Sequence, residues 1–154
     1  MAATLAEGIL DHIYANVIPS MTGIYDGTSG VSVARHRALP YELSEHPAIV
    51  IRGGPDEVRE GSANMAYIDR SLTVFIDIYV KSNGAYYANL DYIRSEVYGL
   101  MMASRDLGLT YVMDTLPAGD DEPELATLEK PAMKQTMTFN IYYRHNINSS
   151  SELS

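Results

Sequence analysis

The sequence contains no cysteine, and this absence removes several classes of chemistry. Disulfide bonds, thiol catalysis and thiolate metal sites are all excluded. Tryptophan is also absent and phenylalanine occurs twice, whereas tyrosine occurs 12 times. Because tyrosine combines a large apolar ring with a hydroxyl that stays in water, this bias fits surfaces that become interfaces. It fits equally the ordinary use of tyrosine in a core and at its rim.

Long apolar runs are missing as well. No stretch approaches the roughly 20 apolar residues that a membrane-spanning helix needs. The first residues, "MAATLAEGILDHIY", have no basic region and carry acids within the apolar stretch, which argues against a signal peptide. With 46% hydrophobic and 20% charged residues among 154, the composition is that of a globular protein with a core. We expect synthesis in the cytosol, one domain over residues 1–145 and a polar tail over 146–154.

Basic residues are scarce. The 11 Lys and Arg stand against 20 Asp and Glu, which gives a net charge of −9. Proteins that bind DNA or RNA tightly usually present a basic surface patch, so tight binding of nucleic acid is not expected. Seven of the acids lie between residues 106 and 129, where there is no Lys or Arg. This run is either a solvated loop or an acidic surface that meets a partner and repels polyanions.

Two segments have the periodicity of amphipathic helices. Thr4 and Glu7 have the spacing of a capping box, and apolar residues then recur every four positions over residues 5–17. Pro19 stops this first helix. The second helix is expected over about residues 85–105, where apolar residues are three and four positions apart.

Alternation of apolar and polar residues predicts the strands. The segment 70–81 alternates most clearly, with one aliphatic face and one face of aromatic, hydroxyl and charged groups. The aliphatic face should lie under the helices. The mixed face is of a kind that is half-exposed, or buried only when another subunit arrives. The expected strands are residues 31–37, 48–52, 70–81, 109–116 and 132–144.

The segments between the strands are polar. Residues 53–69 are expected to form a long loop or an irregular hairpin arm, and 117–131 an acidic loop. The order of elements predicts an α+β fold. It is a two-layer domain, with a largely antiparallel sheet of about five strands covered on one face by two helices.

The stretch "HPAIVIRGGPDEV", residues 46–58, places an Arg and two Gly at the end of an apolar run. A Gly-rich turn can cradle a phosphate when it opens a helix and carries Lys and Ser or Thr. Here Pro-Asp-Glu follows, and both the helix and the Lys are missing. A turn after a strand is therefore the better interpretation. We expect Arg52 to meet a carboxylate of the same chain or of a neighbouring subunit.

The sequence has no recognisable catalytic motif or regular metal site. It contains no nucleophile elbow, Walker loop or dinucleotide-binding turn. The four His are scattered without the spacing of metal ligands. The segments "DGTSG" and "GDDEPE" supply oxygen atoms but lack the pattern of a calcium loop. We expect no enzymatic activity, no cofactor and no metal.

Several motifs nevertheless occur in a familiar order. After the N-terminal helix come "VARHR" at residues 33–37 and "HPAIVIRGGPDE". An Arg-led alternating strand, "RSLTVFIDIYV" at residues 70–80, follows. Then come a helix with "LD" and "IRSEVYGLM", an "LGL" segment, an acidic loop and a last strand ending in "YYR". Over residues 1–144 the chain resembles the tail terminator, or tail completion, proteins of long-tailed bacteriophages.

The resemblance implies a structural virion protein. Such proteins form a ring, usually of six subunits, that caps the tail tube, ends tube polymerisation and joins the tail to the head connector. DNA passes through the lumen without specific binding. The expected partners are other copies of the chain, the tail-tube protein and a head–tail connector or neck protein, with no membrane involved. The protein would lie at the head–tail junction of the virion, and in the host cytoplasm during assembly.

A ring of this kind needs a lumen and contacts between subunits. An acidic lumen would repel the phosphate backbone and let DNA slide. The lumen candidates are Asp120, Asp121, Glu122 and Glu124. Ring contacts are heterologous, so one patch must meet a different patch on the neighbour. The candidates for contact with a neighbouring subunit or with the tube are Arg35, Arg37, Arg52, Arg59, Arg70, Phe75 and Tyr79.

Other functions remain open at this stage. Another head–tail neck adaptor, or a tail-tube subunit, would share the apolar pattern, although tube subunits usually contain more strand and fewer helices. A small enzyme or ligand-binding α+β domain would need a pocket with convergent polar groups, and the sequence shows no such cluster.

Overall fold

The protein was described from a computed structural model, which covers residues 4–18, 24–25, 28–29, 32–35, 47–59, 67–82, 84–126 and 132–146. Within these ranges no helix has the length and apolar character needed to cross a membrane. In chain order the elements are α1 (Leu5–His12), η1 (Ile13–Val17), β1 (Ile24–Tyr25), β2 (Thr28–Ser29), β3 (Ser32–Arg35), β4 (Ala48–Val58), β5 (Tyr67–Lys81), α2 (Tyr86–Met102), β6 (Val112–Asp120), β7 (Glu124–Ala126) and β8 (Ala132–Asn146).

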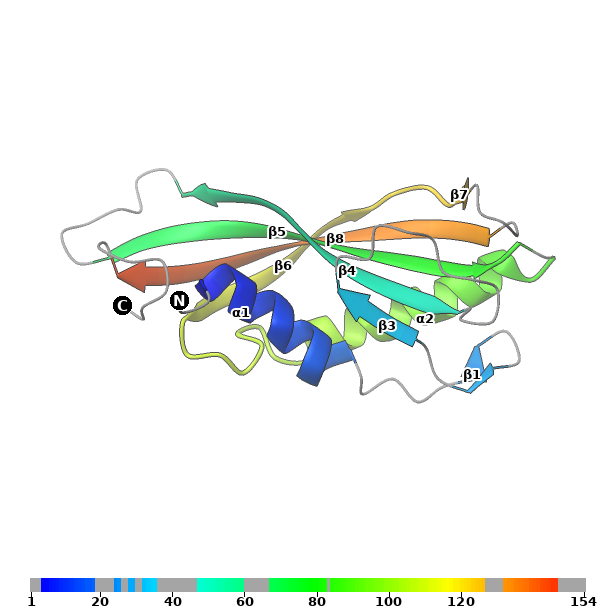
Figure 1. Cartoon of the computed structure of the whole chain (residues 1–154), viewed down its shortest axis with the longest axis horizontal. Helices are drawn as coiled ribbons and strands as arrows, with labels where there is room; N and C mark the ends of the chain where they lie inside the picture. Colours follow the sequence, from blue (N-terminus) through cyan, green and yellow to red (C-terminus); the bar gives the residue numbers. More distant parts are fainter. Residues whose placement is uncertain are drawn as a thin grey trace.

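The main sheet has the strand order β3-β4-β5-β8-β6, and the short β7 also pairs with β8. β3 runs parallel to β4, and every other pair in this sheet is antiparallel. The centre of the sheet is the ladder between β5 and β8, which pairs all 15 residues of each strand. α1 and α2 lie on the same face of the sheet (Figure 1). This arrangement confirms the predicted α+β fold with a mostly antiparallel sheet and two helices.

The first helix begins as the capping box predicts. The side-chain oxygen of Thr4 accepts a hydrogen bond from the backbone N–H of Glu7, 3.1 Å away. The helix then widens into the π-helix η1, and the helical conformation continues to Ile18. Ile9 and Ile13 are fully buried on its inner side. The side chain of His12 ties this helix to the segment that follows α2, because its Nε2–H donates to the carbonyl of Leu107 at 2.6 Å.

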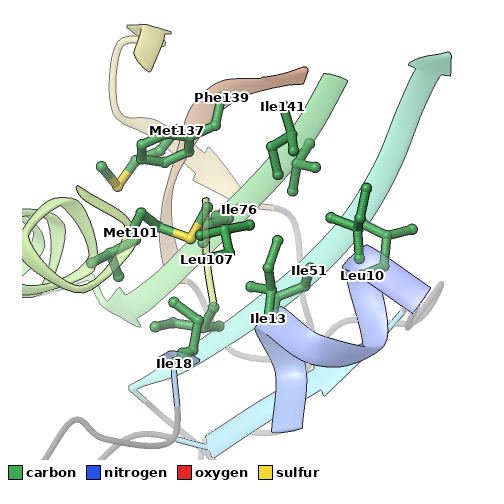
Figure 2. Close-up of a cluster of buried hydrophobic side chains, with 14 of the residues drawn as sticks. Leu10, Ile13, Ile18, Ile51, Ile76, Met101, Leu107, Met137, Phe139 and Ile141 are labelled. Carbon is green, nitrogen blue, oxygen red and sulfur yellow. The ribbon is translucent and has the colours of Figure 1, made fainter. Parts of the chain in front are cut away.

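The core lies between the helices and the inner face of the sheet (Figure 2). The aliphatic face of β5 is buried under the helices, as expected from the alternation in its sequence. Cross-strand partners share a face, so Ile76 lies beside Met137, and Val74 beside Phe139. Further buried side chains of this core are Leu10, Ile51, Ile93, Met101 and Ile141.

The expectation that Gly53-Gly54-Pro55 breaks the strand was wrong. β4 continues through these residues to Val58, with a register shift between Gly53 and Asp56. A β-bulge of this kind absorbs a proline because the local ladder is already interrupted. β5 likewise begins at Tyr67 rather than at residue 70. Much of the predicted arm is therefore strand, and residues 60–66 lie outside the described parts.

The predicted acidic loop was also partly wrong. β6 runs through Pro117 to Asp120, with register shifts on either side, and β7 follows it. Proline is tolerated because, among the described strands, β6 forms an edge of the sheet. The second helix ends at Met102, earlier than expected, and a turn follows in which Leu107 has φ 55°. The last strand extends two residues beyond the prediction, to Asn146.

Gly54 gives a test of the packing at the bulge. A Cβ at this position would lie 2.6 Å from Cε2 of Phe75 and 3.2 Å from the carbonyl oxygen of Thr73. We expect Gly54→Ala to lower the free energy of unfolding by roughly 1–3 kcal/mol in urea denaturation. The cost should shrink in a Phe75→Ala background, where the ring no longer fills the space. Gly99→Ala, on an open part of α2, is the matched control and should not destabilise. If Gly54→Ala destabilises the Phe75→Ala variant as much as it destabilises the wild type, contact with the Phe75 ring is not the cause.

Candidate interaction surface

The face of the sheet turned away from the helices is the main candidate for function. We call it the open face, because no helix of the described residues lies over it (Figure 1). In β5 it carries Thr73, Phe75 and Tyr79, which are half-buried. Asp77 lies among them and is buried. The sequence predicted this mixture of aromatic, hydroxyl and charged groups on one side of the strand.

The centre of the open face is an ion pair between Arg52 and Asp77. Nε of Arg52 donates to Oδ2 of Asp77 at 2.5 Å, and Nη2 donates to Oδ1 at 3.0 Å. The hydroxyl of Thr136 donates to the same carboxylate at 2.6 Å. The hydrogen bond to Asp77 is the largest cause that raises the pKa of Arg52, and the negative charge of Asp121 adds to it. The expectation that Arg52 meets a carboxylate is confirmed within the same chain.

Cations on the open face are stacked on aromatic rings. Stacking of this kind is worth about 0.5–1 kcal/mol at exposed sites, and it holds the cation in a fixed orientation. Arg59, Phe75 and Tyr79, all candidates from the sequence, take part in these pairs. The pairs, with the distance from the cationic atom to the ring centre, are Arg52–Phe75 at 4.8 Å, Arg59–Tyr142 at 4.4 Å, Lys134–Tyr79 at 6.0 Å and Arg144–Tyr67 at 3.8 Å.

Arg144 forms a second bidentate ion pair on this face. Its Nε and Nη2 donate to the two carboxylate oxygens of Asp69 at 2.6 and 3.1 Å. The hydrogen bond to Asp69 raises the pKa of Arg144. Since both side chains come from opposed positions of β8 and β5, the pair reinforces their register. The sequence did not indicate this pair, because 75 residues separate its members.

Arg70 lies on the other side of the sheet. Its Nε donates to Nε2 of His145 at 2.8 Å. Nearby, the hydroxyl of Tyr143 donates to the carboxylate of Asp56 at 2.7 Å. Burial, followed by this hydrogen bond, raises the pKa of Tyr143. Of the remaining arginine candidates, Arg35 has its backbone in β3, and Arg37 lies outside the described residues.

The acidic residues proposed for a lumen lie on β6, on β7 and between them. Asp120 is 3.5 Å from Nη1 of Arg94 on α2, so it faces the helix side. The backbone of Asp121 is held to β8, because its N–H donates to the carbonyl of Thr136 at 2.9 Å. Glu122 is exposed, and Glu124 is exposed opposite Lys134 in the ladder. The four acids therefore do not all share one face.

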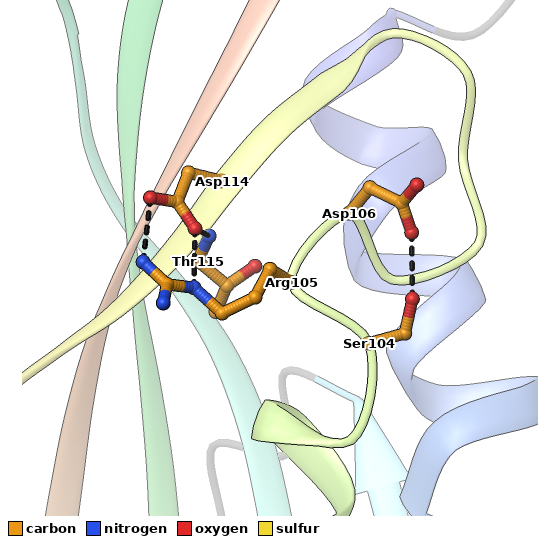
Figure 3. Close-up of polar contacts among 5 residues, drawn as sticks. All are labelled: Ser104, Arg105, Asp106, Asp114 and Thr115. Atoms are coloured by element: carbon orange, nitrogen blue, oxygen red, sulfur yellow. Dashed lines mark hydrogen bonds and ion pairs between the residues drawn. The ribbon is translucent and has the colours of Figure 1, made fainter.

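A polar cluster that the sequence did not indicate lies after α2. Nε and Nη2 of Arg105 donate to the two carboxylate oxygens of Asp114 at 2.5 and 2.7 Å (Figure 3). These hydrogen bonds hold the pKa of Asp114 below its ordinary value. The pKa of Asp106 is also lowered, first by the hydroxyl of Ser104. The Arg105–Asp114 pair ties the turn that follows α2 to the start of β6, whereas Asp106 accepts from Ser104 and Gly108 within that turn.

A shallow groove of about 380 Å³ lies between α2 and the sheet and is lined by Arg94, Tyr98 and Asp120. Its arginine already faces two carboxylates. In the described parts of the chain, no three His, Asp or Glu side chains come together as a metal site. The open face gathers arginine and tyrosine, which are among the residue types enriched at the energetic centres of protein interfaces.

No protein-family model matches the chain, and no curated protein sequence matches it significantly.

The Arg52–Asp77 pair predicts an asymmetry between two truncations. The side chain of Asp77 is 3% exposed and that of Arg52 is 39% exposed. Arg52→Ala leaves a buried carboxylate without its cation, and we expect a loss of roughly 2–4 kcal/mol in the free energy of unfolding. Asp77→Ala leaves a guanidinium that water can reach, so its loss should be smaller. Urea denaturation at pH 7 measures the free energy of unfolding of both variants. If Asp77→Ala loses more than Arg52→Ala, the burial of Asp77 does not decide the size of the loss.

The Arg105–Asp114 pair gives a test by titration. We expect Arg105→Gln to raise the pKa of Asp114 toward its ordinary value, because the two hydrogen bonds from the Arg105 guanidinium are lost while that from the N–H of Thr115 remains. Since the folded-state pKa is lowered, the pair stabilises the fold above the ordinary Asp pKa and loses this effect as the pH falls through the lowered value. NMR titration of the carboxyl carbons measures the shift. Asp106, whose pKa depends on Ser104, is the internal control, and an equal shift of both groups would contradict this assignment.

Proposed function

We propose that the protein is a structural subunit of a phage tail terminator ring. In this role several copies form a ring that caps the tail tube, ends its polymerisation and joins it to the head connector. The proposal rests on the order of motifs that resembles the tail terminator family. It is supported by the α+β domain those motifs form, with one long sheet and both helices on one face.

The observation that carries the proposal is the composition of the open face. Arginine and tyrosine are enriched in interfaces between proteins, where aromatic rings give contact area and arginine gives directed hydrogen bonds. Among the described residues of the open face, Arg52, Arg59, Lys134 and Arg144 are stacked on rings, and carboxylates also hold Arg52 and Arg144. Side chains fixed in this way lose little further entropy when a partner arrives. This favours a surface that is prepared for another protein.

The charge of the chain supports the passage of DNA through such a ring. A net charge of −9 in each copy is multiplied around the ring. The resulting field repels a phosphate backbone and keeps DNA from adhering. Acidic residues facing the lumen would strengthen this effect. In the virion the ring would lie at the head–tail junction.

The test is the assembly state of the full-length protein, alone and with tail tubes. We expect native mass spectrometry to show a closed oligomer, and electron microscopy to show it at one end of each tube. Tubes polymerised in its presence should stop growing, because the ring covers the surface that adds the next subunit. Protein that stays monomeric, with and without tubes, would refute the proposal. Protein that polymerises into long tubes by itself would favour a tail-tube subunit instead.

A further inference from the structure

We propose that His145 is a proton-sensitive latch that opens one end of the sheet in mild acid. We call this end the tip, defined as residues 67–68 of β5 and 145–146 of β8, which form the last two pairs of the ladder between these strands. In Figure 1 the paired strands reach the tip at the left of the view, beyond α1. The latch acts within one copy of the chain and does not depend on the proposed ring.

The hydrogen bonds of His145 show that its ring is neutral. Its Nε2 lies 2.8 Å from Nε of Arg70. Because a guanidinium only donates, Nε2 accepts this bond with its lone pair. Nδ1 lies 2.6 Å from the carbonyl oxygen of Asn146, which only accepts, so the single ring proton is on Nδ1. This geometry leaves no place for a second proton.

Burial makes a second proton costly. His145 is 3% exposed, and its ring centre lies 6.4 Å from that of Tyr143. A proton on Nε2 would point at the N–H of Arg70 and would put a second positive charge beside the guanidinium. A buried cation is expensive unless a carboxylate pairs with it. The protonated ring must therefore leave its site.

The groups around His145 do not offset that charge. The carboxylate of Asp56 already accepts from the hydroxyl of Tyr143 at 2.7 Å. Within the described residues, no carboxylate forms an ion pair with His145. The titratable and charged groups that the neighbouring elements place on this side of the sheet are Arg70 of β5, Asp56 of β4, Tyr143 of β8, Tyr111 before β6, and the exposed Glu7 and Asp11 of α1.

Departure of the ring opens the tip and leaves the rest of the ladder closed. One position further in, Arg144 holds Asp69 on the opposite face of the sheet by two hydrogen bonds. This pair contains no histidine, so proton uptake by His145 does not break it. Opening should therefore stop at this pair. The tip is ordered at neutral pH and offers a fixed surface, which is lost in mild acid.

The direction of the pH effect follows from the number of protons bound. In the closed tip the ring of His145 carries one proton, whereas in the open tip it is free to carry two. The open form binds more protons, so the closed form is stable at neutral pH and is lost as the pH falls. An unconstrained histidine takes up its proton at about pH 6.5, so the equilibrium constant for opening should rise roughly tenfold between pH 7.5 and pH 5.5.

Two backbone N–H groups report on the tip. The N–H of Arg144 donates to the carbonyl of Tyr111, away from β5. The N–H of the next residue, His145, therefore points across the ladder to its partner Ile68, and that of Ile68 points back. Exchange of these two N–H groups with solvent requires the tip to open.

Amide hydrogen exchange, measured by NMR on the full-length protein, tests the latch. After correction for the intrinsic rate, we expect the protection of Ile68 to fall roughly tenfold between pH 7.5 and pH 5.5, while that of Val74 in the middle of the ladder stays unchanged. His145→Gln keeps an oxygen that accepts from Arg70 but takes up no proton, so the fall should disappear. His12→Gln removes the other described histidine, and this control should keep the fall.

The wild-type ring gives a second measurement that needs no variant. At pH 7.5 the nitrogen chemical shifts of His145 should show a proton on Nδ1 and none on Nε2. As the pH falls, protonation of the ring and loss of protection at Ile68 should share one midpoint. This measurement decides the question even if His145→Gln leaves the tip unprotected at both pH values.

Three results would overturn the latch. They are protection at Ile68 that does not fall in acid, a fall of equal size in a His145→Gln variant whose tip is closed at pH 7.5, and a wild-type ring that takes up its second proton while Ile68 stays protected. Each concerns the tip alone, so rings that cap tail tubes are compatible with any of them. Failure of the proposed function would likewise leave the latch intact.

Discussion

The ladder between β5 and β8 is the constraint on which the rest of the structure depends. It pairs 15 residues of each strand and brings together parts of the chain on either side of α2, β6 and β7. Side chains alternate between the two faces, so a slip of β8 by one residue against β5 would move Phe139 out of the core. The same slip would separate Asp77 from Thr136 on the open face. One register therefore fixes both the core and the candidate surface.

The polar groups of the open face both stabilise the register of the strands and set the chemical composition of the surface. Their hydrogen bonds across strands stabilise the register, as in the pair of Arg144 with Asp69. Their rings and stacked cations also form a surface with the composition of a protein interface. If the open face only separated the core from solvent, polar residues of any kind could occupy its alternating positions. The repeated stacking of Lys and Arg on aromatic rings is what favours the second role, and it supports the proposed assembly function.

Much of the fold could be predicted because local patterns carry it. The cap that the Thr4 side chain gives the first helix and the alternation of residues 70–80 both appeared where the sequence placed them. The predicted strand ends were wrong where glycine and proline suggest that a strand stops. Gly53-Gly54-Pro55 and Pro117 lie within strands, because pairing with β5 and β8 outweighs the local preference and bulges absorb the irregular residues. The acidic loop was misjudged for the same reason.

The sequence by itself determined which side of each long strand is apolar, and hence which side the helices cover, because the period of a strand is two. It also determined the chemical character of the opposite side. Only the tertiary structure decided which of those polar groups meet. Arg52 reaches Asp77 across 25 residues, and Arg144 reaches Asp69 across 75. Such pairs depend on the register of strands that are far apart in the chain, and no local pattern encodes that register.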